Sequence, residues 1–293
     1  MDFRKLSKLN VIKSYFLLVT MAILLIVVID LISLYFNSTY SLLGVTTMAL
    51  IFSVFSTFIS YYNSDKIVLK MTKAIIIDHE ANPQLYNLVE EMALASGVKM
   101  PKVGIVTDDA PNAFATGRDE DHGVIVFTTS ILDLMDREEL QGVVAHELSH
   151  IKNRDTLVSA IVTSTAGLIA VLSDVMLRIV AHSSSNRKNS NPFILPAILI
   201  AMILAPIAAL LIQAAVSRKR ESLADASAVA FTRNPAGLRK ALEKLQSDST
   251  VVQARANSVA HLWIESPLPK KKLNLFATHP TIQSRIETLR AME

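Results

Sequence analysis

Two histidines and a glutamate in the stretch DREELQGVVAHELSHIKNRD form the clearest chemical pattern of the sequence. Asp136 with Glu139 three positions later predicts a capped helix N-terminus. Apolar residues then recur at helical spacing, at Leu140, Val143, Val144, Leu148 and Ile151. His146 and His150 therefore lie one turn apart on one helix face, where they can bind a single zinc ion, and Glu147 can reach a water on that metal. The alternative is a surface helix with two histidines, which the apolar pattern and a third ligand downstream disfavour.

A catalytic zinc site needs a third protein ligand and keeps its fourth position for water. The chain has no cysteine, so that ligand must be a histidine or a carboxylate. Glu221 in ESLAD is the strongest candidate. Asp225 follows one helical turn later on the same face, where it can accept a hydrogen bond from the outer nitrogen of a ligating histidine. The alternative for Glu221 is a surface glutamate that pairs with Arg218 or Lys219.

These residue types together define a reaction. Zinc lowers the pKa of a bound water to about 7 and polarises the scissile carbonyl. Glu147 takes the proton of the attacking water and later delivers it to the leaving amine. The oxyanion needs a further donor, and His279 and Arg285 in THPTIQSRI are the candidates, unless they cap or brace the last helix. The sequence therefore predicts peptide-bond hydrolysis with one Zn²⁺ per chain.

Apolar stretches surround this chemistry. Of the 293 residues, 51% are hydrophobic and 19% are charged, and the mean hydropathy is +0.38, which indicates membrane segments. A hydrocarbon core is about 30 Å thick, and the runs that suit it are 15–36, 40–62, 156–180 and 193–216. They pair into two helical hairpins. The third run is the weakest, and a buried hairpin of a soluble domain is its alternative. The first run is too long for a signal peptide and lacks a cleavage site.

Basic residues predict the orientation of the chain. On the N-terminal side of the membrane they are Arg4, Lys5, Lys8, Lys13, Lys66, Lys70, Lys73, Lys152, Arg154, Arg218, Lys219 and Arg220. On the opposite side they are only Arg178, Arg187 and Lys188. By the positive-inside tendency, both termini and the helix of His146 face the cytoplasm of a multi-pass plasma-membrane protein. The net charge of +3 is too small to argue for a nucleic-acid partner.

The polar region before the histidines predicts a small sheet. Pro83 to Gly97 has the spacing of an amphipathic helix. Strands are expected at 102–106 and 123–128, with a short strand and a charged turn between them. A strand directly before the metal helix can act as an edge that pairs with an extended peptide substrate. The candidate substrate contacts are then Asn112, Gly123 and Val124, and an ordinary sheet strand is the equal alternative.

The predicted fold class is a mainly α membrane protein with two transmembrane helical hairpins and a zincin-like α+β protease domain, which holds a small sheet and the HExxH helix. The expected domains are a two-helix membrane anchor at 1–63, the first part of the protease domain at 64–155, the second hairpin at 156–216 and the second part of the protease domain at 217–293. Further helices are expected at 220–232, at 236–245 and from Pro280, as first helical residue, onward. The second hairpin enters and leaves the membrane on the same side. It is therefore expected to bring Glu221 close to the HExxH helix.

AHELSH with IKNRD, SRKRESLAD and THPTIQSRI resembles the HtpX family, membrane-bound zinc endopeptidases related to the CAAX prenyl protease. The resemblance covers nearly the whole chain, including NAFATG at 112–117. It implies zinc ligands at His146, His150 and Glu221, and Glu147 as catalytic base. It also implies a role in degrading misfolded or damaged membrane proteins under stress, with those proteins and the lipid bilayer as partners.

Two positions depart from the family pattern. Ser222 stands where an aromatic residue is common, and Thr281 stands where a second proline is common. Neither touches a proposed ligand, so they bear on fine geometry or substrate preference rather than on activity. Two other functions stay open. A prenyl-protein protease uses the same chemistry but is expected to have more membrane spans. A non-enzymatic membrane scaffold or transporter that binds metal would not need Glu147, since a structural zinc site requires no base.

Overall fold

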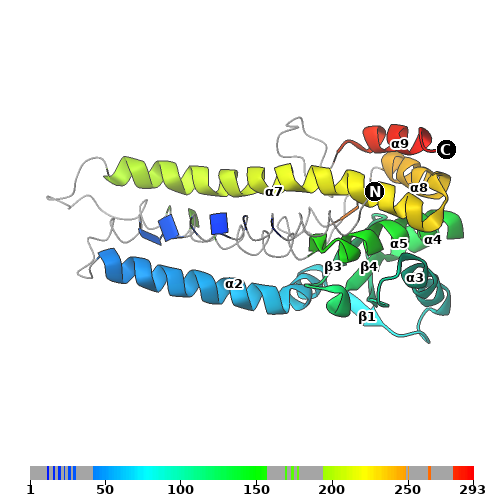
Figure 1. Cartoon of the computed structure of the whole chain (residues 1–293), viewed down its shortest axis with the longest axis horizontal. Coiled ribbons are helices and arrows are strands. Elements are labelled where there is room, and N and C mark those ends of the chain that lie inside the picture. The colour runs from blue at the N-terminus through cyan, green and yellow to red at the C-terminus, as the bar shows by residue number, and fades with distance from the viewer. Residues whose placement is uncertain are drawn as a thin grey trace.

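Two long helices, α2 (Leu42–Thr72) and α7 (Ile194–Thr232), extend in one direction from a group of shorter helices and a small sheet (Figure 1). This computed structural model describes residues 42–156, 194–248, 250, 263–264 and 280–293, with single positions between 12 and 30 and between 169 and 177. The shorter helices are α3 (Pro83–Ser96), α4 (Thr129–Leu134), α5 (Arg137–Lys152), α8 (Pro235–Ser247) and α9 (Ile282–Arg290), with one 3-10 turn, η1 (Glu120–His122). The architecture is helix-rich with a small mixed sheet.

The described strands form one sheet in the order β1-β2-β4-β3. β1 (Ile75–Ile77) runs antiparallel to β2 (Lys102–Val106), and β2 runs parallel to β4 (Val124–Thr128). β3 (Ala113–Thr116) runs antiparallel to β4 on its other side. The strands and the charged turn at Glu120–His122 confirm the predicted order of elements in this region.

The position of β4 corrects one expectation. Gly123 and Val124 were candidate contacts at a free edge, because their strand comes shortly before the metal helix. β4 instead pairs with β2 on one side and with β3 on the other, so its backbone groups are already used. A peptide cannot add to an interior strand. The ordinary-strand alternative is therefore the right one for Val124. Gly123 precedes β4, and its carbonyl already accepts from the Lys102 N–H.

Alternation along the strands gives the sheet two apolar faces, as the two-residue period of a strand requires. One face contributes Val103, Ala113, Ala115, Ile125 and Phe127 to an apolar cluster that also holds buried residues of α3, α5, α8 and α9. The other face carries a smaller cluster of Val68, Val106, Ala110, Phe114, Val124, Val126 and Trp263. The first cluster holds the buried apolar residues of α5 and is the core on which the site rests.

The amphipathic helix predicted from Pro83 is α3, which ends with Gly97 in the left-handed conformation at φ +67°. Helix α4 was not predicted; the Thr128 side chain caps its N-terminus by accepting from the Ile131 N–H. The last helix begins later than predicted, because Thr281 rather than a residue before it caps the chain by accepting a hydrogen bond from the Ser284 N–H. Pro280 is therefore outside α9.

The long helices also differ from expectation. The segments predicted separately at 193–216 and 220–232 form the single helix α7. Helix α2 contains the predicted run 40–62 from Leu42 onward and continues past a kink at Asn63. Within the described parts of the chain, no helix combines the length and the apolar character that crossing a bilayer demands. The runs at 15–36 and 156–180 lie outside the described residues except for single positions, so the membrane hairpins stay a prediction.

Candidate metal centre

Helix α5 presents three of the predicted site residues. Its N-terminus is closed by a capping box, in which the Asp136 side chain accepts from the Glu139 N–H and the Glu139 side chain accepts from the Asp136 N–H. The helix then runs without interruption through His146, Glu147 and His150. The capping box and the helix confirm the prediction made from the spacing alone. Since His146 and Glu147 are almost fully buried, the helix presents them to the interior of the domain.

Helix α7 supplies the other two. Glu221 and Asp225 lie one turn apart on this helix, and both are buried. Asp225 is held by the Arg285 guanidinium of α9. The alternative that Glu221 is a surface glutamate is wrong, because only 4% of the residue is exposed.

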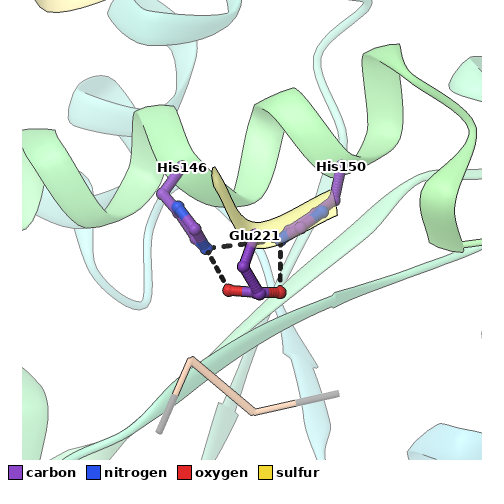
Figure 2. A group of neighbouring side chains, drawn as sticks. All are labelled: His146, His150 and Glu221. Atoms are coloured by element: carbon purple, nitrogen blue, oxygen red, sulfur yellow. Dashed lines mark hydrogen bonds and ion pairs between the residues drawn. The ribbon is translucent and has the colours of Figure 1, made fainter. Parts of the chain in front are cut away.

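The side chains of His146, His150 and Glu221 point toward one another across the gap between α5 and α7 (Figure 2). The two Nε2 atoms are 3.3 Å apart, Nε2 of His146 is 3.4 Å from Glu221 Oε2, and Nε2 of His150 is 3.5 Å from Glu221 Oε1. Tetrahedral zinc with ligand bonds of about 2.0–2.2 Å separates its ligand atoms by about 3.3–3.6 Å. The donor set and its spacing therefore fit a zinc ion.

A carboxylate backs each imidazole on the side away from this cluster. Nδ1 of His146 is 3.0 Å from Asp225 Oδ1, and Nδ1 of His150 is 3.2 Å from Asp155 Oδ2. In the neutral imidazole that binds a metal, a proton on Nδ1 leaves Nε2 with a lone pair directed at the cluster. Sequence reasoning placed Asp225 in this role and missed Asp155. The signal was present, since Asp155 follows His150 closely, but it lies beyond the helix end at Asn153, where helical spacing no longer applies.

The buried charged groups of the site shift one another's pKa values. Burial alone would lower the pKa of the His146 imidazole, but its hydrogen bonds to Asp225 and Glu221 raise that pKa to about 9. Burial would raise the pKa of the Asp225 carboxyl, but the Arg285 charge and the contact with His146 lower it to about 2. The same carboxylates raise the pKa of Arg285 further above its ordinary value. Without a metal, the site therefore holds a network of charged groups.

Glu147 differs from its neighbours because it has no such partner. It is 1% exposed, and neither of its carboxyl oxygens has a hydrogen-bond partner among the described residues. Burial raises the pKa of this carboxyl. A buried carboxyl group that is left without a hydrogen bond needs an explanation, and a function in proton transfer supplies one.

The remaining predicted residues lie in different places. Arg285 is buried beside the cluster and holds Asp225. His279 lies outside the described residues. Asn112 precedes β3 and is buried, with its N–H donating to Thr128 Oγ1 and its carbonyl accepting from the Thr128 N–H. The outer side of β3 is also occupied, because Trp263 forms a β-bridge with Phe114.

Comparison with known proteins places these residues in a family context. Residues 79–293 match the family described as Peptidase family M48, a range that includes every residue of the cluster. A "Protease HtpX homolog" of Thermoanaerobacter pseudethanolicus is 43% identical over 97% of this chain and 95% of that protein. A protein of the same name from Desulforapulum autotrophicum is 44% identical over 83% of this chain and 80% of the other.

One solved structure is also similar, that of Ste24p from S. mikatae. The match covers 97% of this chain and 66% of that protein, with 18% sequence identity and a TM-score of 0.49. A likeness of that strength supports no conclusion about this chain.

Proposed function

Because the chain belongs to peptidase family M48 and is a metallopeptidase, we propose that it is an endopeptidase whose single zinc ion is held by His146, His150 and Glu221. The observation that carries this proposal is the convergence of the three side chains: the two Nε2 atoms are 3.3 Å apart, and they lie 3.4 and 3.5 Å from the two different carboxylate oxygens of Glu221. This spacing suits a tetrahedral ion with one open position. The set lacks thiolates, and two imidazoles with one carboxylate are a donor set typical of catalytic rather than structural zinc.

The zinc ion and the protein side chains would contribute different steps to peptide hydrolysis. A zinc ion at this site supplies Lewis-acid chemistry, which lowers the pKa of a water and polarises a carbonyl. Glu147 accepts the proton of the attacking water on a carboxylate oxygen and then donates it to the nitrogen of the leaving amine. Its burial favours this exchange, because a carboxyl with a raised pKa holds the proton long enough to pass it on. Asp225 and Asp155 keep the two imidazoles in the required tautomer.

The membrane setting is part of the proposal. Large apolar side chains are exposed along α2, at Met48, Leu50, Ile51, Phe52, Val54, Phe55, Phe58, Ile59 and Tyr62, and along α7, at Ile200, Ile203, Leu204 and Ile207. Exposed apolar surface of this extent is typical of membrane or protein contacts. We propose an anchor at 1–63, a second hairpin at 156–216 and a protease domain built from 64–155 and 217–293. The charge distribution favours a cytoplasmic site at the plasma membrane. The resemblance to the HtpX family implies misfolded or damaged membrane proteins as substrates.

Cleavage of an unfolded protein tests this function. Apo protein in detergent should cleave casein only after zinc is added. Glu147→Gln should bind zinc as the wild type does and lose about 10²–10⁴-fold in rate, because it removes the proton acceptor. Ser222→Ala, an exposed neighbour of Glu221, serves as the control and should keep full activity. Equal rates for the wild type and Glu147→Gln would refute the assignment.

A further inference from the structure

The contacts of Arg285 differ from the role of oxyanion donor for which the sequence made it a candidate. Its Nε and Nη2 donate to the two carboxylate oxygens of Asp225 at 2.9 and 2.7 Å. Its Nη1 donates to the backbone carbonyl of Ile264 at 3.1 Å and lies 3.5 Å from Glu221 Oε2. The side chain is 2% exposed. Each nitrogen of the guanidinium is therefore engaged with the protein, which leaves little capacity to bind an oxyanion.

The Ile264 carbonyl belongs to a segment that is fixed to the sheet. The Ile264 N–H donates to the Ala113 carbonyl at 2.9 Å, and Trp263 forms an antiparallel bridge with Phe114. The Trp263 ring is fully buried and meets the Phe114 ring edge-on, with centroids 4.7 Å apart. Contacts thus run without a gap from the helix of Glu221, through Arg285 and Ile264, to the outer side of β3.

We propose that Arg285 is a positioning residue that fixes the Glu221–Asp225 face of α7 relative to the Trp263–Ile264 segment on β3. This proposal rests on the proposed metal centre and refines it. A planar guanidinium can grip both oxygens of a carboxylate and a third acceptor at once, which an ammonium group cannot do. Its charge also offsets two carboxylates that lie one turn apart on the same helix face. Arg285 therefore sets where Glu221 stands before any metal binds.

Two spectroscopic signals test this proposal, one at the Trp263–Ile264 segment and one at the metal site. Trp263 is the only tryptophan of the chain, so intrinsic fluorescence reports on its segment alone. Cobalt(II) bound in place of zinc reports on ligand geometry through its visible absorption. In Arg285→Gln we expect cobalt affinity to fall about 10–100-fold with altered absorption bands. We also expect Trp263 emission to move to longer wavelength and acrylamide quenching to increase.

Two further variants distinguish an effect on the metal site from an effect on the Trp263–Ile264 segment. Asp225→Asn should lower cobalt affinity but leave Trp263 emission near that of the wild type, because Arg285 keeps the Ile264 carbonyl. Arg285→Lys keeps the charge and should fold, with cobalt affinity between those of the wild type and Arg285→Gln. It remains informative if Arg285→Gln does not fold.

A direct role of Arg285 in catalysis would give a different set of results. If Arg285→Lys or Arg285→Gln slows cleavage but leaves cobalt affinity, the cobalt bands and Trp263 emission unchanged, Arg285 acts on the reacting carbonyl and the proposal is overturned. Both signals are read without substrate. A wild type that binds cobalt without cleaving casein would refute the peptidase assignment and leave this inference standing.

Discussion

The α5 side and the α7 side of the metal centre are held by different forces. On α5, the histidines follow a capped N-terminus and sit among apolar residues such as Val143, Val144 and Leu148, which are fully buried. On α7, Glu221 and Asp225 depend on a buried ion network with Arg285 of α9. Apolar packing is insensitive to charge, whereas a buried ion pair becomes strongly destabilising when one partner is removed. The two sides should therefore respond to different substitutions.

Asp225→Asn should have the largest effect, because it removes the carboxylate that accepts from both Nε and Nη2 of the buried Arg285 and leaves that charge with Glu221 alone, 3.5 Å from Nη1. We expect the free energy of unfolding of the apo protein to fall by about 3–5 kcal/mol. Chemical denaturation measures this, with Asp133→Asn as control, since Asp133 is an exposed aspartate on α4. If both variants lose the same stability, the α7 side does not depend on its ion network.

The pH dependence of metal binding should be set by the carboxylates of α7, because they hold the proton on His146. Without metal, His146 holds a proton with a pKa of about 9, raised by Asp225 and Glu221 against the effect of burial, and a metal must displace that proton. Apparent zinc affinity should therefore rise about tenfold per pH unit up to about pH 9 and then level off. Competition with a chelator at several pH values measures this.

The same proton contributes to the stability of the apo protein. Because the folded pKa lies above the ordinary value of 6.5, this contribution is complete below about pH 6.5 and is lost as the pH rises through about 9. In Asp225→Asn, zinc affinity should level off at a lower pH. Zinc affinity that does not change below pH 9 would contradict the charged network.

Gly142→Ala probes the α5 side through packing. A Cβ at Gly142 would lie 2.6 Å from the backbone nitrogen of Leu238, so α5 and α8 would have to separate. We expect a loss of about 1–3 kcal/mol in unfolding free energy. Zinc affinity should change little, since no charged contact is touched. Gln141→Ala is the neighbouring control, and a variant that lost zinc while keeping its stability would show that the two sides are not separate.

Asp155→Asn should have the smallest effect on the site. His150 keeps 15% of its side chain exposed, and an amide oxygen can still accept from its Nδ1 at the position of Asp155 Oδ2. We expect zinc affinity to fall by about tenfold, at the low end for a residue that supports a metal ligand. A loss as large as that of Asp225→Asn would mean that both histidine supports are equivalent.

The same contrast explains what the sequence could predict. The capping box, the α5 helix, α3 and the strands follow from spacing within a few residues, so Asp136, Glu139 and the two histidines were placed correctly. The start of α9 at Ile282 and the continuity of α7 depend on small differences between competing local signals. The interior position of β4 and the bridge from Trp263 to Phe114 are tertiary pairings, which no local pattern encodes. Glu221 was found from its residue type, but its distance from the histidines needed the structure.

X-ray absorption at the zinc edge tests most directly whether His146, His150 and Glu221 hold one zinc ion. We expect one zinc per chain, bound by two histidine nitrogens with oxygen ligands at about 2.0–2.2 Å. We also expect that zinc to be lost in Glu221→Ala but not in Ser222→Ala. A spectrum without two histidine ligands, or one that is unchanged in Glu221→Ala, would contradict this assignment.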